Sequence, residues 1–244
     1  MSGEPRRRQL TGPSQVEAGL ESCEPIRLIL VAEKPTDARV PLLTERAKEL
    51  GIPVRTASAA SLWRLSVTTP PSEILALVGP DPARSREQVL AAGGVVWLMV
   101  ETAYPGNTGF AIRTAEVSGA QGIFVDNDFD HEGRREALRA SMRADHYMPV
   151  FWEPALPVVA DARKAGRRCL AVEDVGTEAP WDIDLTGPLL FVVGGERHGV
   201  PTPVLDACHG VLRIPMEGFI PSYNLQAAMA VVAGERLRQL SLGA

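Results

Sequence analysis

Three short segments of this 244-residue chain combine glycines with polar side chains that can bind or orient a substrate. They read YPGNTGFAIRTAEVSG over residues 104–119, FVVGGERHGVP over 191–201 and IPMEGFIPSYN over 214–224. Arg113 can hold an anion, because a guanidinium keeps its proton and directs a fork of donors toward phosphate or carboxylate. Glu196 and His198 carry groups that act as acids or bases. Ser222 and Asn224 both suit the N-cap of a helix.

The same residues also have structural explanations, which the sequence leaves open. Paired glycines straight after an apolar run let two backbone segments approach closely, whether or not a ligand is bound. The segment around Gly194 and Gly195 matches neither the dinucleotide fingerprint G-x-G-x-x-G nor the phosphate loop G-x-x-x-x-G-K-[ST]. An ordinary nucleotide-binding α/β enzyme is therefore the weakest interpretation. Arg113 falls in the first turns of an expected helix, where the dipole disfavours a cation, so an anionic partner there would be favourable.

Alternating apolar and amphipathic segments predict an α/β fold. Strands are expected at 26–33, 52–58, 73–79, 95–101, 122–128, 148–152, 168–174, 188–196 and 211–216. Helices are expected at 38–51, 59–66, 83–94, 135–145 and 155–166, with a loop and helix at 107–120 and a last helix from Ser222. The later strands are apolar on both faces, which is typical of a mainly parallel sheet covered by helices. Ligands of such sheets lie beyond the carboxyl ends of the strands, where the three segments lie.

Composition and patterning divide the chain into three parts. Residues 1–24, with three consecutive arginines, are expected to form a disordered arm, followed by a small α/β domain over 25–94 and a larger one over 95–244. A net charge of −5 argues against nucleic-acid binding through bulk positive charge, so such binding would depend on local clusters. One cluster places Arg135, Arg139 and Arg143 on one helix face, and the other comprises Arg163, Lys164, Arg167 and Arg168.

The cysteines and the apolar runs bear on cofactors and location. Cys23, Cys169 and Cys208 are scattered and have no metal-binding spacing, so we expect no metal site and a reducing, cytoplasmic setting. No apolar run approaches the roughly 18 residues that span a bilayer, and the N-terminal segment lacks the apolar core of a signal peptide. We therefore expect no membrane partner.

Taken together, the three segments resemble the motifs of the SpoU family of RNA ribose methyltransferases, a branch of the SPOUT fold class. NTGFAIRTA is similar to the family's N-x-G-A-x-x-R-T-A, GGERHG to G-x-E-G-x-G, and IPMEGFIPSYN to I-P-M-x-G-x-x-x-S-L-N. The motifs stand in the family's order within residues 95–240. The preceding domain, above all ILVAEKPTDARVPLLTERAKELGIPVRTAS, resembles the L30e-like substrate-binding domain found in front of many members.

The resemblance implies a knotted fold and a methyl transfer. In the family a deep C-terminal trefoil knot holds S-adenosylmethionine in a bent shape, and members act as homodimers whose active sites combine residues of two chains. The substrate implied is a ribose 2′-hydroxyl of structured rRNA or tRNA. The residues implied in cofactor binding are Gly194, Gly195, Gly199, Ile214, Met216 and Tyr223. The residues implied in catalysis are Arg113, Asn107, Glu196, Ser222 and Asn224.

Arg113 corresponds to the family's catalytic arginine, and two roles stay open for it. It would serve as the base, or it would orient the hydroxyl and the adjacent phosphate. Phe110, Arg197 and Tyr223 depart from the family motifs. A long cation at position 197, beside the cofactor loop, would repel the sulfonium, narrow the cleft or reach RNA phosphate. A non-catalytic RNA-binding protein with weak or no cofactor binding is therefore the alternative to an enzyme.

Overall fold

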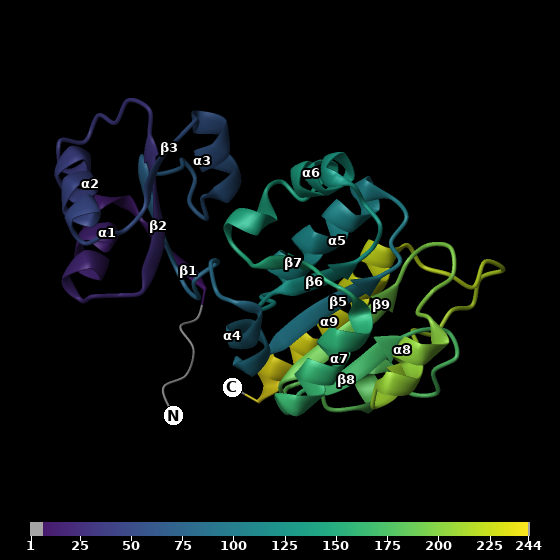
Figure 1. The fold of residues 1–244 in the computed structure, drawn as a ribbon. Coiled ribbons are helices and arrows are strands. Elements are labelled where there is room, and N and C mark those ends of the chain that lie inside the picture. Colours follow the sequence, from purple (N-terminus) through teal and green to yellow (C-terminus); the bar gives the residue numbers. More distant parts are fainter. Residues whose placement is uncertain (1–6, 244) are drawn as a thin grey trace. The chain divides into compact units, whose positions relative to one another are not determined.

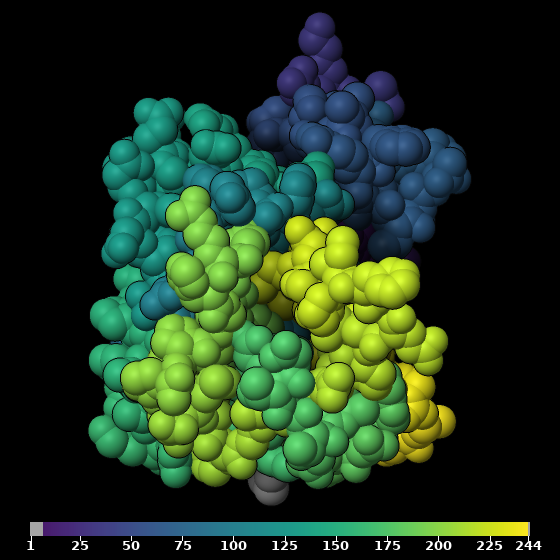
Figure 2. All heavy atoms as spheres, turned by 90° about the vertical axis from the view of Figure 1, so that its right-hand side faces the viewer, coloured from purple at the N-terminus to yellow at the C-terminus, as the bar shows by residue number. Residues whose placement is uncertain are grey.

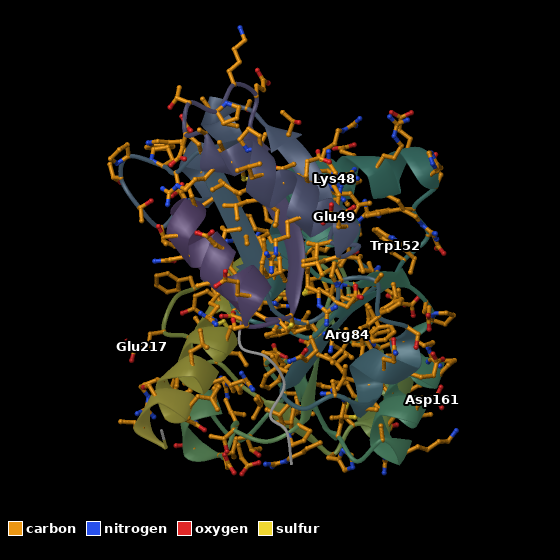
Figure 3. The ribbon with its side chains drawn as sticks, turned by 90° about the vertical axis from the view of Figure 1, so that its left-hand side faces the viewer. Lys48, Glu49, Arg84, Trp152, Asp161 and Glu217 are labelled. Atoms are coloured by element: carbon orange, nitrogen blue, oxygen red, sulfur yellow. The ribbon has the colours of Figure 1, made fainter. Side chains whose placement is uncertain are left out.

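The computed structural model describes residues 7–243, which form two compact units (Figure 1). The first unit ends at Asp81 and the second begins at Pro82, whereas the sequence analysis placed the boundary after residue 94. The difference is α4 (Arg86–Ala91), which packs in the core of the second unit through Val89 and Leu90. An ion pair of 3.0 Å also joins Arg86 to Asp161, which lies at the edge of the second unit (Figure 3).

The first unit is a four-stranded sheet in the order β1-β4-β2-β3. β4 runs antiparallel to both β1 and β2, and β2 runs parallel to β3. The strands are β1 (Arg8–Thr11), β2 (Ile26–Ala32), β3 (Val54–Ala57) and β4 (Ile74–Val78), and the helices are α1 (Gly12–Glu21), α2 (Arg39–Glu49) and α3 (Ala59–Leu65).

The expectation of a disordered arm is wrong for residues 8–21, because these residues form β1 and α1. Leu10 of β1 and both Val16 and Leu20 of α1 are buried in the core of the first unit. Val16 and Leu20 stand one helical turn apart, which is the spacing of a buried helix face. Burial of these three apolar side chains stabilises the folded segment, although its composition is mostly polar. Residues 1–6, including the first of the three arginines, lie outside the described residues.

The second unit is a six-stranded, all-parallel sheet in the order β10-β8-β9-β5-β6-β7. This agrees with the parallel sheet expected from the apolar strands. Its strands are β5 (Val95–Val100), β6 (Ile123–Asp126), β7 (Val150–Trp152), β8 (Arg168–Val172), β9 (Leu189–Gly194) and β10 (Gly210–Leu212). Its other helices are α5 (Pro105–Val117), α6 (His131–Ala140), α7 (Ala155–Lys164), α8 (Thr202–Ala207) and α9 (Leu225–Leu242), with short turns η1 (Ala144–His146) and η2 (Pro180–Asp182).

The two faces of this sheet carry separate cores, and β5 contributes to both. Trp97 and Met99 face a cluster that includes residues of α5 and α9. Val96 and Leu98 face a second cluster with residues of α4, α7 and α8. Successive strand side chains point to opposite faces, so an apolar strand of this kind is stable only when helices cover both. No helix within residues 7–243 is both long and apolar enough to cross a membrane.

Arg167 is buried and holds the segment that leads into β5. Its guanidinium donates to five backbone carbonyls, those of Val89, Leu90, Ala92, Gly94 and Leu189, at 2.5 to 3.0 Å. The carbonyls at the end of α4 have no partner within that helix, and Arg167 provides one. This corrects the second basic cluster of the sequence analysis, because Arg167 is not available to bind phosphate.

We predict that Arg167→Met destabilises the protein by on the order of 3 kcal/mol, because it leaves several buried carbonyls without donors. Arg168→Met is the matched control, since Arg168 is exposed and its loss should cost less than about 0.5 kcal/mol. Urea denaturation of both variants measures the difference. Equal midpoints would contradict a structural role for Arg167.

Candidate active site

The three glycine-containing segments follow β5, β9 and β10, so they meet at one edge of the parallel sheet. Within the pairing of β5 with β9, Val100 lies opposite Gly194, so both strands end at the same level. Figure 2 shows a hollow on this face, between the lime-green segment near residues 195–200 and the yellow segment near residues 215–225. The three segments that carry the predicted site residues therefore meet at the edge where such sheets bind ligands.

The first segment is helical earlier than expected. α5 begins at Pro105, because proline fits the first position of a helix, and Asn107 and Gly109 consequently lie in the helix and not in a loop before it. A Cβ at Gly109 would stand 2.3 Å from the carbonyl oxygen of Ala137 in α6. Gly109 therefore allows α5 and α6 to pack closely.

Glu196 joins the second segment to the first. Its Oε1 accepts a hydrogen bond from Asn107 Nδ2 at 2.7 Å, and its Oε2 accepts one from the backbone N–H of Ala103 at 3.0 Å. Both carboxylate oxygens are thus used to hold the start of α5. This arrangement brings two of the predicted catalytic residues into direct contact. Both contacts support a positioning role for Glu196, in which its carboxylate holds the start of α5.

Arg113 lies in the third turn of α5 and is exposed. Its Nη1 donates to the thioether sulfur of Met142, which is a weak acceptor, and no carboxylate within the described chain pairs with it. The guanidinium therefore keeps most of its donors for an external anion. Met142 and Arg143 have φ values of 57° and 61°. Residues other than glycine rarely adopt positive φ values, and such residues recur at functional sites. Because α6 ends at Ala140, Arg143 does not share a helix face with Arg135 and Arg139, as the sequence analysis expected.

The glycines of the second segment permit two close approaches of backbone and one positive φ. A Cβ at Gly194 would stand 2.0 Å from the carbonyl carbon of Gly199, and one at Gly195 would stand 2.0 Å from the carbonyl oxygen of Glu101. Gly199 has a φ of 67°. Each position therefore requires glycine, and together they fold residues 194–199 into a tight loop against the end of β5.

Arg197, one of the departures from the family motifs, turns toward the first segment. Its guanidinium carbon lies 5.8 Å from the centroid of the Tyr104 ring, within the range of a cation–π contact. Tyr104 and Phe110, both on or next to α5, are half exposed. The charge of Arg197 is thus partly stabilised by an aromatic ring.

The third segment has a buried start and an exposed tip. Ile214 is buried and Met216 is half-buried, whereas Glu217 projects away from the unit (Figure 3). Asn224 is the N-cap of α9 and accepts a hydrogen bond from Gln226 N at 3.0 Å. Ser222 and Tyr223 are exposed, and α9 begins at Leu225, three residues after the predicted start.

Glu173, directly after β8, is a residue of this edge that the sequence analysis did not single out. Its Oε1 accepts a hydrogen bond from the backbone N–H of Val200 at 2.5 Å, and its own N–H donates to the carbonyl of Leu212 at 2.9 Å. Burial raises the pKa of its carboxyl, and the neighbouring Asp174 adds to the effect. Its place at the carboxyl end of an apolar strand was the signal that could have identified it.

The predicted site residues thus fall into two groups. Asn107, Glu196 and the glycines of residues 194–199 are joined by direct contacts. Across residues 7–243, by contrast, no hydrogen bond connects Ser222 or Asn224 to Arg113 or Glu196. The described side chains contain no group of three or more histidines, cysteines or acids that could hold a metal ion.

Two protein families match the two units of the chain. Residues 94–234 match the SpoU rRNA Methylase family, which is more than half of the chain. Residues 10–83 match the family described as RNA 2′-O ribose methyltransferase substrate binding. The second match begins inside β1, which agrees with the observation that this strand is part of the first unit.

Individual proteins resemble the chain over most of their length. The 23S rRNA (guanosine-2′-O-)-methyltransferase RlmB of Pseudomonas aeruginosa is 29% identical over 228 residues, which cover 88% of this chain and 89% of the relative. RlmB of Photobacterium profundum is 27% identical and covers 88% and 91%. Two solved structures share the fold at 21 to 22% identity: the SpoU methyltransferase AviRb of Streptomyces viridochromogenes (TM-score 0.60, 97% and 91% covered) and an AdoMet-bound rRNA methyltransferase of Sinorhizobium meliloti (0.59, 96% and 88%).

We predict that Glu196→Ala accelerates amide hydrogen exchange at Ala103, because the N–H of Ala103 loses its acceptor. Global stability should fall by less than about 1 kcal/mol, since Glu196 is exposed. Glu196→Gln keeps an acceptor oxygen and should leave the exchange at Ala103 slow. Fast exchange at Ala103 already in the unchanged protein would contradict the described contact.

Proposed function

Because the chain belongs to the SpoU rRNA methylase family, we propose that it transfers a methyl group from S-adenosylmethionine to a ribose 2′-hydroxyl of structured rRNA or tRNA. The observation that carries this proposal is the contact of Glu196 with Asn107 and Ala103. It fixes the second segment against the start of α5, the helix that carries Arg113. A loop suited to the methyl donor and a cation suited to RNA are thereby held at one sheet edge.

The hollow beside residues 194–199 fits the methyl donor. Its loop is built from glycines that let backbone groups stand close together, and the half-buried carboxylate of Glu173 has no cationic partner within the described chain. Such a site suits a ligand that carries positive charge. The residues that would hold the donor are Gly194, Gly195, Gly199, Ile214, Met216 and Tyr223. When bound, the donor supplies an electrophilic methyl group on a sulfonium.

Arg113 acts by orientation in this proposal. Its guanidinium lies against a thioether and not a carboxylate, so its donors are available to a phosphate oxygen and to the hydroxyl of the neighbouring ribose. Such contacts align the reacting oxygen and stabilise the charge that develops on it. Asn107, held by Glu196, fixes the start of the same helix. Ser222 and Asn224 shape the third segment, where Asn224 caps α9.

Ribosomal RNA is the substrate that we favour over tRNA. The relatives from Pseudomonas and Photobacterium are named as 23S rRNA methyltransferases, and their similarity extends over both units. The first unit, matched by a substrate-binding family, gives the protein a second surface for a large structured RNA. We propose a cytoplasmic setting, which the RNA substrate and the free thiols of the three cysteines support.

We further propose a homodimer, which two features of α5 and α9 support. Val117 on α5 and Leu237 on α9 are exposed apolar residues, 73% and 46% accessible, and the two helices pack against one another. Exposed apolar side chains on two packed helices favour association with a second copy of the chain. A partner chain would also bring its own Ser222 and Asn224, which have no hydrogen bond to Arg113 within one chain.

The proposed fold includes the family's trefoil knot. Residues 173–188, which connect β8 to β9, contact both the segment after β10 and α9. Arg213 N donates to the carbonyl of Glu178 at 2.9 Å, and Leu185 N donates to Gln239 Oε1 at 2.8 Å. The connection is thus in contact with both neighbours of the third segment, as a threaded chain requires. A crystal structure would test the knot. If its chain could be drawn out straight from the two ends without passing through a loop, the knot would be contradicted.

We predict that Arg113→Ala lowers methyl transfer at least about 100-fold, because the hydroxyl loses the group that aligns it. The assay measures transfer of labelled methyl from S-adenosylmethionine to unmodified rRNA and tRNA, with the product identified as an alkali-resistant 2′-O-methyl dinucleotide. Arg168→Ala removes an exposed arginine at the opposite end of the sheet and should leave the rate within about twofold.

The assay also separates the competing functions. Label confined to one RNA pool identifies the substrate class. A full rate in Arg113→Ala would contradict the role of the arginine while leaving the enzyme intact. No label in either pool, combined with no heat of S-adenosylmethionine binding, would favour the non-catalytic RNA-binding protein that the sequence left as the alternative.

We predict that Val117→Glu dissociates the homodimer without unfolding the chain. The charge would be buried unpaired in the interface, whereas Val117 is exposed in the single chain. Light scattering after size-exclusion chromatography should give about half the mass of the unchanged protein. Leu42→Glu on α2, where Leu42 is 72% exposed, is the control and should keep the larger mass. A monomeric unchanged protein would contradict the dimer.

A further inference from the structure

Glu173 is a half-buried carboxylate of this sheet edge that joins two of the segments and forms no ion pair in the described chain. It follows β8, whereas the predicted cofactor residues follow β9 and β10. Its Oε1 accepts from Val200 N at 2.5 Å, and its backbone N–H donates to the carbonyl of Leu212. One residue therefore contacts the second segment through its side chain and the start of the third through its backbone.

The fit of this carboxylate against the second segment is close. A Cβ at Gly199 would stand 2.6 Å from Glu173 Oε1, so the carboxylate lies directly against the backbone of that glycine. Gly199 also donates its N–H to the carbonyl of Gly195 at 3.2 Å. The bond from Val200 N to Glu173 therefore fixes the closing end of the 194–199 loop.

The charge on Glu173 is costly where it stands. The side chain is half-buried, its neighbour Asp174 is also acidic, and burial raises the pKa of the Glu173 carboxyl. A group with a raised pKa in the folded state favours folding when protonated, and that contribution is lost as the pH rises through its folded pKa. The folded surroundings therefore favour the ionised carboxylate less than water does. A charge that its surroundings disfavour, close to residues predicted to bind a ligand, is a feature of functional sites.

We propose that Glu173 is a positioning residue for the methyl donor, and that its charge selects the cationic donor over the neutral product. This inference rests on the proposed function. Transfer of the methyl group converts the sulfonium of S-adenosylmethionine into the thioether of S-adenosylhomocysteine, so the ligand loses one positive charge. A carboxylate against the 194–199 loop, which carries predicted cofactor residues, attracts the donor more strongly than the product. It thereby favours replacement of the spent product by a new donor.

Titration calorimetry with S-adenosylmethionine and S-adenosylhomocysteine tests the inference without RNA. In Glu173→Gln the amide oxygen still accepts from Val200 N but the charge is gone. We expect the donor to bind about tenfold more weakly, while product affinity stays within about twofold. Tm at pH 7 should rise, because a buried charge is removed. Glu173→Ala removes the acceptor as well and should weaken both ligands.

Asp174→Asn is the matched control, because it removes an exposed charge next to Glu173 and should change the ratio of the two affinities less than about twofold. Equal losses for both ligands in Glu173→Gln, or a lower Tm with an unchanged ratio, would overturn the inference in favour of a purely structural role. An unchanged protein that binds neither ligand would overturn the proposed function itself. A protein that binds both ligands and is insensitive to Glu173→Gln would overturn the inference alone.

Discussion

The close approach of the backbone after β9 to the backbone after β5 is the constraint on which the candidate site depends. β5 and β9 end level with one another, and the carbonyl of Glu101 occupies the space that a side chain at position 195 would need. Glycine is therefore required at 195, and Glu101 itself adopts a φ of 54°. Once the two segments touch, Glu196 reaches Ala103 and Asn107 and fixes α5. The position of Arg113 follows from that of the helix.

Charged groups near this edge fall into two classes. Glu196 accepts a hydrogen bond from the protein at each of its carboxylate oxygens, so it stabilises the arrangement. Arg113 has only a thioether as its partner, and Glu173 has no cation beside it in the described chain. Charges that the fold leaves uncompensated are expected where a ligand of opposite charge binds. By this criterion we propose Arg113 as the group for the anionic RNA and Glu173 as the group for the cationic methyl donor.

Packing also explains residues whose sequence context suggested another role. Arg167, in a basic segment, is buried among carbonyls that end α4 and flank β5. Gly109, which belongs to the first motif, allows α5 and α6 to pack closely because it has no side chain. Leu10 and Val16, in a polar stretch, complete the core of the first unit. In each case the neighbours that decide the role are distant in the chain, so the local sequence was compatible with both interpretations.

The sequence by itself determined the parallel α/β class, because strands apolar on both faces require helices on both sides. It also determined the three segments at the site, since their glycines, Arg113 and Asn224 stand at expected strand and helix ends. Only the tertiary structure decided that Glu196 holds Asn107, that Arg113 rests on Met142 and that Glu173 binds Val200. These contacts join residues that 27 to 89 positions separate. Side-chain types and local periodicity indicate which chemical groups a segment carries. The order of the strands in the sheet decides which of these groups come into contact.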